Sequence, residues 1–320
     1  MDILFITHNR LGDAVLSSGL YGHLAERHPE ARITVACGAV PAPLFAEAPN
    51  LATIVELHKQ PYLGHWRQLW QHGIGRRWQL VVDLRGSAIA WLLRAGQRRV
   101  LRPPAMPMHR VAMLGTLLDL SPPPAPRLWA APAQRQRAEQ LIAGDRPVLA
   151  LGPTANWGGK QWPGDRFAAL ARRLTADDGA LPGARIAVFG APQEREAAAP
   201  TVARLPADAR LDLVGKVDLP TLYACLQRCQ LFVGNDSGLM HMAAAADIPT
   251  LGLFGPSREE LYAPWGPRAA AVRTPESFEE ITGHPAYDYR RHESWMTSLS
   301  VDRVAQAATE LLHRTAAEAA

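Results

Sequence analysis

One segment, residues 231–257 (LFVGNDSGLMHMAAAADIPTLGLFGPS), most constrains how this chain can fold. It contains, in order, an apolar run, a polar turn, a helix of small residues, a second apolar run and a Gly-Pro loop. The short and continuous apolar runs at residues 231–233 and 249–254 are typical of buried parallel strands. Residues 235–238 (NDSG) are of the types that favour the start of a helix. The segment therefore predicts a strand, a helix and a second parallel strand of an α/β fold.

The same segment predicts an anion site. A helix that begins directly after a buried strand directs free backbone N–H groups toward the strand's carboxyl end, and its dipole adds about half a positive charge there. The loop at residues 255–257 follows the second strand and should lie on the same edge of the sheet. Ligands of open α/β sheets bind at this edge, so a phosphate is the expected ligand.

The chain has 320 residues, more than one core usually organises, so we expect two domains. Strands and helices alternate in both halves, which predicts two Rossmann-like domains with parallel sheets. In the first half we expect strands at 2–7, 32–36, 53–57, 80–84 and 99–101, and helices at 13–28, 41–48, 64–77, 87–94 and 109–120. In the second half we expect, besides residues 231–257, strands at 147–151, 184–189 and 210–214, and helices at 165–174, 192–205 and 219–228.

The proline-rich stretch at residues 121–126 is the best linker candidate, although the boundary can lie as late as Asp145. We therefore divide the chain into domains at residues 1–145 and 146–320. Residues 301–314 have apolar residues at helical spacing and predict a closing helix, which can pack back on the N-terminal domain.

Composition excludes several classes of protein. The hydrophobic content of 48% and charged content of 20% are globular values, and three Cys without paired spacing favour a reducing compartment. The N-terminus resembles no export signal, and no apolar window is long enough to span a membrane, so we expect a cytoplasmic protein. The net charge of +4 comes mainly from arginine and favours anionic partners. Nucleic acid is a poor candidate because no nucleic-acid-binding motif is present.

The motifs of several enzyme classes are absent. Residues 7–13 (THNRLGD), after the first predicted strand, lack the Gly-x-Gly-x-x-Gly of dinucleotide-binding proteins. The loop at residues 152–161 resembles a phosphate loop, but its spacing is wrong and Gln161 replaces the hydroxyl residue that would hold magnesium. No Gly-x-Ser-x-Gly, His-Glu-x-x-His or Asp-x-Asp occurs. We therefore expect a metal-independent reaction with no cofactor.

Three residues are candidates for chemistry. Asp13 follows the first predicted strand, and its carboxylate is either an ordinary first-turn residue of a helix or a general base. Lys160 follows the first predicted strand of the second half, in a Gly-rich loop, and is either a surface lysine or a cation that faces phosphate. His241 lies one turn into the helix predicted within residues 231–257, and its side chain is either packed in the core or part of the site.

Two clusters in the first half have open interpretations. Trp66 and Trp70, with neighbouring histidines, either contact a membrane interface or pack against the protein's own sheet. Six arginines either hold an anionic acceptor or are solvated: Arg85, Arg94, Arg98, Arg99, Arg102 and Arg110.

With these residues in view, nearly the whole chain resembles glycosyltransferase family 9, the ADP-heptose:lipopolysaccharide heptosyltransferases. The matching pieces, in order, are LGD at 11–13, KQWP at 160–163, FGA at 189–191 with Glu194, NDSGLMH at 235–241, FGPS at 254–257 and WMTSLSVD at 295–302. The resemblance implies an α/β fold of the GT-B type, with two Rossmann-like domains whose parallel sheets face each other across a cleft. It also implies an N-terminal acceptor-binding domain and a C-terminal nucleotide-sugar-binding domain.

Carried over residue by residue, the resemblance implies that Asp13 removes the proton from the acceptor hydroxyl and that Lys160 neutralises the departing diphosphate. Glu194 would hold the ribose, and Lys216 with Val217 would line the adenine. The diphosphate and sugar would be received by Asp236, Ser237, Gly238, Leu239 and His241. Thr154 and Asn156 are provisional phosphate contacts, because the loop before the lysine departs from the family pattern, and we assign Arg10 and Arg85 to the acceptor.

The function implied by the resemblance is inverting, metal-independent transfer of heptose or a similar sugar from an ADP-sugar to the inner core of lipopolysaccharide. Such a displacement needs a base on one face of the anomeric carbon and charge stabilisation on the other. The expected partners are a nucleotide sugar and a lipopolysaccharide-type glycolipid, with peripheral contact at the cytoplasmic face of the inner membrane and a monomeric protein. The alternatives are a GT-B-type sugar-nucleotide epimerase, a glycosyltransferase with another donor or acceptor, and a non-catalytic nucleotide-sugar binder.

Overall fold

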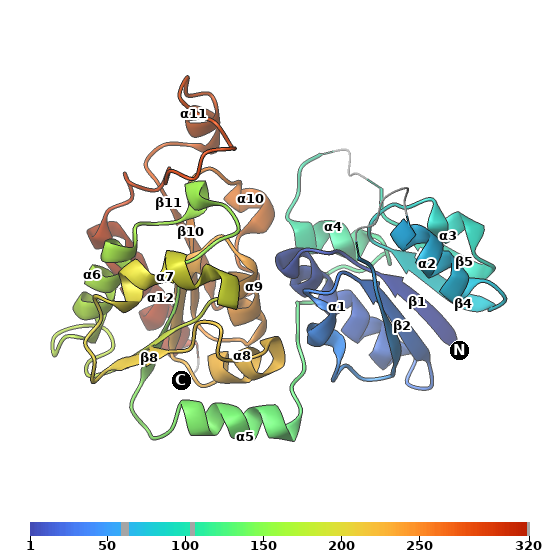
Figure 1. Ribbon diagram of the computed structural model, residues 1–320, viewed down its shortest axis with the longest axis horizontal. Coiled ribbons are helices and arrows are strands. Elements are labelled where there is room, and N and C mark those ends of the chain that lie inside the picture. Colours follow the sequence, from blue (N-terminus) through green and yellow to red (C-terminus); the bar gives the residue numbers. More distant parts are fainter. Residues whose placement is uncertain (59–63, 103–105, 319–320) are drawn as a thin grey trace. The chain divides into compact units, whose positions relative to one another are not determined.

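The computed structural model describes residues 1–58, 64–102 and 106–318 (Figure 1). The chain divides into two compact units, Met1–Ala131 (unit 1) and Pro132–Ala320 (unit 2). This boundary precedes the predicted one at 145/146, because the intervening helix α5 (Pro132–Leu141) packs on α8 (Leu219–Leu226) of unit 2 (Figure 1). Helix α5 is not predicted from the sequence, because its only buried residue is Ala138 and it has no apolar stripe.

Unit 1 contains a parallel sheet in the order β3-β2-β1-β4-β5. Its central strand has four consecutive buried apolar residues, Ile3 to Ile6, as a parallel strand covered on both faces requires. The strands are β1 (Asp2–Ile6), β2 (Arg32–Cys37), β3 (Leu51–Glu56), β4 (Trp78–Asp83) and β5 (Ala95–Val100). The helices are α1 (Leu11–Arg27), the 3-10 helix η1 (Ala42–Phe45), α2 (Gly64–Gly73), α3 (Ile89–Leu92) and α4 (Arg110–Thr116).

Unit 2 contains a second parallel sheet, in the order β11-β10-β9-β6-β7-β8. The strands are β6 (Val148–Gly152), β7 (Arg185–Val188), β8 (Arg210–Asp212), β9 (Leu231–Asn235), β10 (Thr250–Phe254) and β11 (Ala269–Arg273). Besides α5 and α8, the helices are η3 (Gly158–Lys160), α6 (Gly164–Thr175), η4 (Pro192–Glu194), α7 (Arg195–Val202), α9 (Gly238–Ala245), α10 (Glu259–Tyr262), α11 (Phe278–Thr282) and α12 (Val301–Ala317).

The prediction of two Rossmann-like units with parallel sheets is confirmed, and the differences are local. The predicted helices at 41–48 and 192–205 are shortened or divided into 3-10 and α segments, and both stretches begin with proline-containing turns. Strand β11 was not predicted, because its Ala-rich sequence is only partly buried at the sheet edge. The closing helix α12 packs on α6 and on β9 to β11, so its buried face is used within unit 2.

The three cysteines are free and buried. Within the part of the chain that the structure describes, no helix combines the length and the apolar character that crossing a membrane requires.

Candidate active site

Both sheets have a topological switch point. There the chain stops adding strands on one side of its first strand and begins to add them on the other side. In unit 1 it lies between β1 and β4, and in unit 2 between β6 and β9. At such a point the loops leaving the two carboxyl ends diverge and leave room for a ligand. The segments that follow these four strands contain Asp13, in the first turn of α1, and Arg85, Lys160 and Asp236. The structure thus brings the predicted residues to the two positions where α/β sheets bind ligands.

In unit 2, the switch point holds an ion pair between the β6 loop and the β9 loop. Nζ of Lys160 donates to Oδ2 of Asp236 at 2.5 Å. The Asp236 side chain is 8% exposed and that of Lys160 is 25% exposed, so the carboxylate is almost enclosed and the cation reaches the surface. Lys160 is therefore not an ordinary surface lysine.

Three hydroxyl groups at neighbouring strand ends are buried and have no hydrogen-bond partner among the described residues. They belong to Thr154 after β6, Ser237 after β9 and Ser257 after β10. A buried hydroxyl without a partner costs about 1–3 kcal/mol, and three at one sheet edge suit a ligand that supplies acceptor oxygens. Ser237 stands at the N-cap of α9, where backbone N–H groups are also free for an anion.

Asn235 holds the two loops of this switch point together. Its Oδ1 accepts from the backbone N–H of Trp162 at 3.0 Å, and its Nδ2 donates to the carbonyl oxygen of Pro153 at 2.9 Å. The residue is fully buried. Asn235 was predicted at the start of the helix, whereas it ends β9 and fixes the loop that leads to Lys160.

Replacing Asn235 with Ala should lower the free energy of unfolding by about 2 kcal/mol, because two buried backbone groups lose their partners. Urea denaturation measures this loss. The matched variant Asn156→Ala changes an exposed side chain in the same region and should leave stability unchanged within about 0.5 kcal/mol. Equal stability of the two variants would show that Asn235 does not hold the loops.

The predicted nucleotide residues lie along the next strands of the same edge. Oε2 of Glu194 accepts from the backbone N–H of Ala191 at 2.7 Å. A Cβ on Gly190 would lie 3.4 Å from that oxygen and 3.5 Å from Oγ1 of Thr154, so both side chains border one spot. Gly215 has φ of +67° and donates to the carbonyl oxygen of Gly190 at 2.9 Å, which brings the turn at residues 216–217 beside this spot.

The remaining predicted donor residues differ in exposure. Lys216 is exposed and forms an ion pair of 3.5 Å with Asp212, and Val217 is half-buried. Asn156 is exposed. In α9, Gly238 provides the first helical N–H, and Leu239 and His241 are buried at 7% and 4% exposure.

A segment far along the chain supports the Lys160 loop. The backbone N–H of Trp295 donates to the carbonyl oxygen of Gly159 at 3.0 Å, and Oγ of Ser294 donates to that of Gln161 at 2.6 Å. A Cβ on Gly158 would come within 2.1 Å of the carbonyl oxygen of His292, so only glycine fits there. The segment before α12 thus fixes the backbone on both sides of the lysine.

In unit 1, the switch point holds a cluster around Asp13. Asp13 is the third residue of α1, and its side chain is 21% exposed. Nε of Arg110 lies 3.9 Å from Oδ1 of Asp13, and Nη2 of the same guanidinium lies 2.9 Å from Nε2 of His8. A guanidinium only donates, so Nε2 of His8 accepts and the neutral ring carries its proton on Nδ1. Arg110 is one of the six arginines considered for an anionic acceptor, whereas His8 was not predicted as a site residue.

The two residues predicted for the acceptor have different surroundings. Arg85 extends from the β4 end, where its guanidinium lies 4.5 Å from the centre of the Trp66 ring and donates to Oδ1 of Asn9 at 3.2 Å. Burial lowers the pKa of Arg85, and the charge of Asp83 opposes the effect. Arg10 is exposed at the N-cap of α1. Trp66 therefore packs beneath an arginine of its own unit.

His8 predicts a specific pH dependence of stability. Burial lowers its pKa to about 4, with Asp13 opposing and Arg110 and Arg85 adding to the shift. In the unfolded chain, His8 takes up a proton as the pH falls below about 6.5, whereas in the folded chain it stays neutral until about pH 4. The free energy of unfolding is therefore unaffected by His8 above pH 6.5 and falls as the pH drops toward 4.

The variant His8→Gln keeps an acceptor for Arg110 but has no group that titrates at this position. From pH 7 to pH 4, its free energy of unfolding should therefore fall by about 2 kcal/mol less than that of the wild type. Urea denaturation at a series of pH values measures this difference. His58→Gln, at an exposed histidine, should follow the wild type. Parallel pH curves for His8→Gln and the wild type would show that His8 is not held neutral.

Within residues 1–58, 64–102 and 106–318, no group of three His, Cys, Asp or Glu side chains is arranged to hold a metal ion.

Comparison with known proteins adds to these observations. Residues 85–282 match the family model of glycosyltransferase family 9 (heptosyltransferase). The chain is 28% identical to lipopolysaccharide heptosyltransferase 2 of Salmonella typhimurium, with 98% of each protein covered.

Two solved structures share the fold. The glycosyl transferase family 9 structure from Veillonella parvula has a TM-score of 0.82 at 20% identity, covering 98% of this chain and 97% of that one. The structure of E. coli ADP-heptose lps heptosyltransferase II has a TM-score of 0.76 at 24% identity, covering 99% and 100%. The predicted GT-B fold class is confirmed, and since the family model matches most of the chain, this protein belongs to glycosyltransferase family 9 and is a glycosyltransferase.

Proposed function

We propose that the protein transfers heptose from ADP-heptose to the inner core of lipopolysaccharide, with inversion at the anomeric carbon and without a metal ion. The observation that carries the proposal is the placement of Asp13 and Lys160 at the switch points of the two sheets. The donor is taken from the E. coli ADP-heptose lps heptosyltransferase II, and the lipopolysaccharide acceptor from the same protein and from the Salmonella lipopolysaccharide heptosyltransferase 2.

The donor binds at unit 2 in this proposal. The diphosphate accepts hydrogen bonds from the hydroxyls of Thr154, Ser237 and Ser257 and from the first N–H groups of α9, which satisfies donors that are otherwise buried without partners. Nζ of Lys160 faces the leaving phosphate oxygens. Asp236 holds this ammonium in place, so that the cation is already positioned when charge develops on the leaving group.

Glu194 holds the ribose and the turn at Lys216 and Val217 lines the adenine, in line with their positions on the same edge. His241, Gly238 and Leu239 contribute through α9, the two buried side chains by fixing the helix under the sugar and Gly238 by its backbone N–H. Asn156, which is exposed in the loop between β6 and Lys160, is a further phosphate contact in this proposal.

Asp13 is the general base. The acceptor hydroxyl gives its proton to the carboxylate, its oxygen bonds to the anomeric carbon, and the bond from that carbon to ADP breaks with its electron pair on the phosphate oxygen. The attack comes from the face opposite to the leaving group, so the configuration inverts. Arg110 orients the carboxylate, and His8 stays neutral beside it. Arg85 and Arg10 bind the anionic acceptor, which is a glycolipid of the membrane.

A thermal-shift panel of nucleotides tests the donor. Binding to the folded state raises the apparent melting temperature, so ADP and ADP-heptose should each raise it by several degrees, with a smaller effect of UDP and GDP. Stabilisation by UDP or GDP without stabilisation by ADP would overturn the assignment of the donor.

A further inference from the structure

One stretch of unit 1 is unusual in charge. Residues 84–118 contain six arginines and neither Asp nor Glu, although the chain as a whole has nearly equal numbers of basic and acidic residues. Two of the six, Arg85 and Arg110, belong to the site around Asp13. The other four, Arg94, Arg98, Arg99 and Arg102, have no part in the proposed chemistry.

The same stretch exposes large apolar side chains. Trp91 and Leu92, the last two residues of α3, are 60% and 67% exposed. Met106 and Met108 follow at 73% and 36%. Isolated exposed apolar residues are ordinary, but an adjacent Trp and Leu in an arginine-rich stretch indicate an interaction surface.

Trp91 and three of these arginines lie together, and Leu92 and Arg94 follow Trp91 closely in the chain. A surface hollow of about 320 Å³ is lined by Trp91, by Arg98, Arg99 and Arg102, and by the α4 end at Thr116 and Leu117. The guanidinium of Arg98 donates to the backbone carbonyls of Ala90, Leu93 and Ala95 and lies 5.9 Å from the centre of the Trp91 ring. Arg98 thus fixes the turn that presents Trp91.

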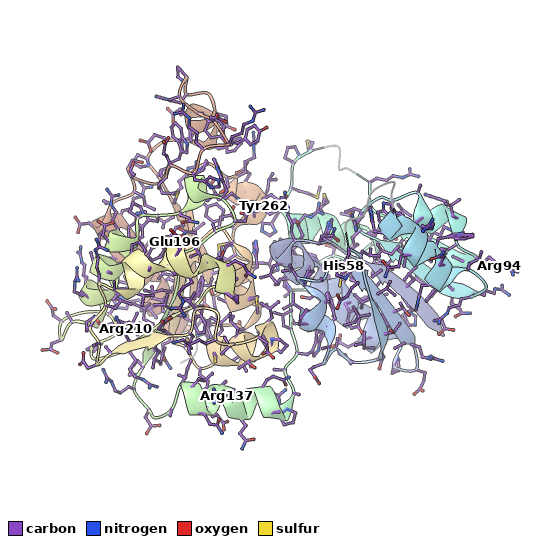
Figure 2. All side chains as sticks on the ribbon, in the orientation of Figure 1. His58, Arg94, Arg137, Glu196, Arg210 and Tyr262 are labelled. Atoms are coloured by element: carbon purple, nitrogen blue, oxygen red, sulfur yellow. The ribbon has the colours of Figure 1, made fainter. Side chains whose placement is uncertain are left out.

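The exposed arginines remain available for a partner. Figure 2 shows the side chain of Arg94 extending away from the ribbon of unit 1. Arg102 is also exposed. Arg99 forms an ion pair of 3.3 Å with Asp119, but both side chains are open to solvent at 45% and 77%, so the pair is weak.

We propose that the surface formed by Trp91, Leu92, Arg94, Arg99 and Arg102 docks on an anionic lipid bilayer. Arginines near a membrane surface are attracted to anionic headgroups, and Trp prefers the boundary between headgroups and acyl chains. A short helix that exposes Trp and Leu beside these arginines supplies both interactions. A second copy of the chain is a poor occupant, because a symmetric contact would place arginines of one copy against arginines of the other.

This docking surface rests on the proposed function in one respect: a glycolipid acceptor is the reason for the protein to approach a membrane. Vesicle binding is measured without donor or acceptor, and transfer is measured on a water-soluble acceptor fragment, so failure of one proposal is distinguishable from failure of the other.

Cosedimentation of the full chain with vesicles tests the docking surface. At low salt, the wild type should bind vesicles that contain phosphatidylglycerol and should not bind vesicles of phosphatidylcholine alone. The double variants Trp91→Ser/Leu92→Ser and Arg94→Gln/Arg102→Gln should each weaken binding by about tenfold or more. Added salt should weaken it further.

Two matched variants in unit 1 serve as controls. Val40→Ser/Ile74→Ser removes two other exposed apolar side chains, and Arg27→Gln/Arg32→Gln removes two other exposed charges. Both should bind within about twofold of the wild type, apart from the long-range effect of net charge, which salt screens. The proposal is overturned if the wild type does not bind anionic vesicles, if the controls lose as much binding as the surface variants, or if Trp91→Ser/Leu92→Ser abolishes self-association instead of vesicle binding.

Discussion

Replacing Asp13 with Asn is expected to lower the rate of sugar transfer by about 10³-fold while ADP still binds with unchanged affinity. Asn has nearly the same size and keeps an oxygen toward Arg110, which lies 3.9 Å from the carboxylate. It cannot accept a proton from the acceptor hydroxyl at neutral pH. Initial-rate measurements of ADP release, together with ADP affinity from calorimetry, separate the loss of the base from a loss of donor binding.

The matched control for this variant is Asp2→Asn. Asp2 is exposed and starts β1, the same strand whose carboxyl end leads to Asp13, so the chemical change is identical and the site is at the other end of the sheet. This control should transfer at the wild-type rate. If Asp13→Asn keeps a rate within about tenfold of the wild type, the base is another group and our assignment is wrong.

The second large effect is expected at Lys160. Replacing it with Met removes the cation that faces the leaving diphosphate and should lower the transfer rate by about 10²- to 10³-fold. It also leaves the nearly enclosed carboxylate of Asp236 without its partner, so the free energy of unfolding should fall by about 2 kcal/mol. Initial rates and urea denaturation give the two quantities.

The double variant Lys160→Met/Asp236→Asn separates these two effects. Neutralising Asp236 removes the unpaired buried charge, so stability should recover toward the wild type, but the transfer rate should stay low because the cation is still absent. Recovery of both stability and rate would mean that Lys160 serves only the ion pair and that the leaving group is stabilised by other groups.

The sequence was sufficient to predict residues that directly follow a strand. Lys160 and Asp236 follow β6 and β9, which are neighbours in the sheet of unit 2, and parallel strands deliver their carboxyl ends to one edge, so the strand pattern already indicated that these two side chains meet. In the same way, the strand pattern placed Asp13 at the carboxyl edge of the sheet of unit 1.

Residues that enter the site from elsewhere could not be predicted in this way. Arg110 reaches Asp13 from the start of α4, which is distant in sequence, and only the folded packing brings the two together. The shift in the pKa of His8 arises from burial and from arginines on other elements, and neither is visible in the residues around position 8. Asn235 looked like a helix-capping residue, and its role in joining two loops depends on Trp162 and Pro153 across the sheet edge.

The exposure of side chains at the surface also could not be predicted from the sequence. The sequence left open whether the Trp66 helix contacts a membrane or packs against the protein's own sheet, and the structure shows Trp66 packed against the core of unit 1, beneath Arg85. The exposed pair Trp91 and Leu92 sits in a helix of four residues, too short to produce a periodic pattern, and became visible only through its exposure.

Product analysis of a single reaction tests the central proposal most directly. The protein is incubated with ADP-heptose and a heptose-deficient inner-core acceptor, and the products are analysed by mass spectrometry and by NMR of the anomeric proton. We predict that the acceptor gains one heptose for each ADP released, with the anomeric configuration inverted relative to the donor. A changed sugar nucleotide without any acceptor, as an epimerase would produce, or a product with retained configuration would contradict this account.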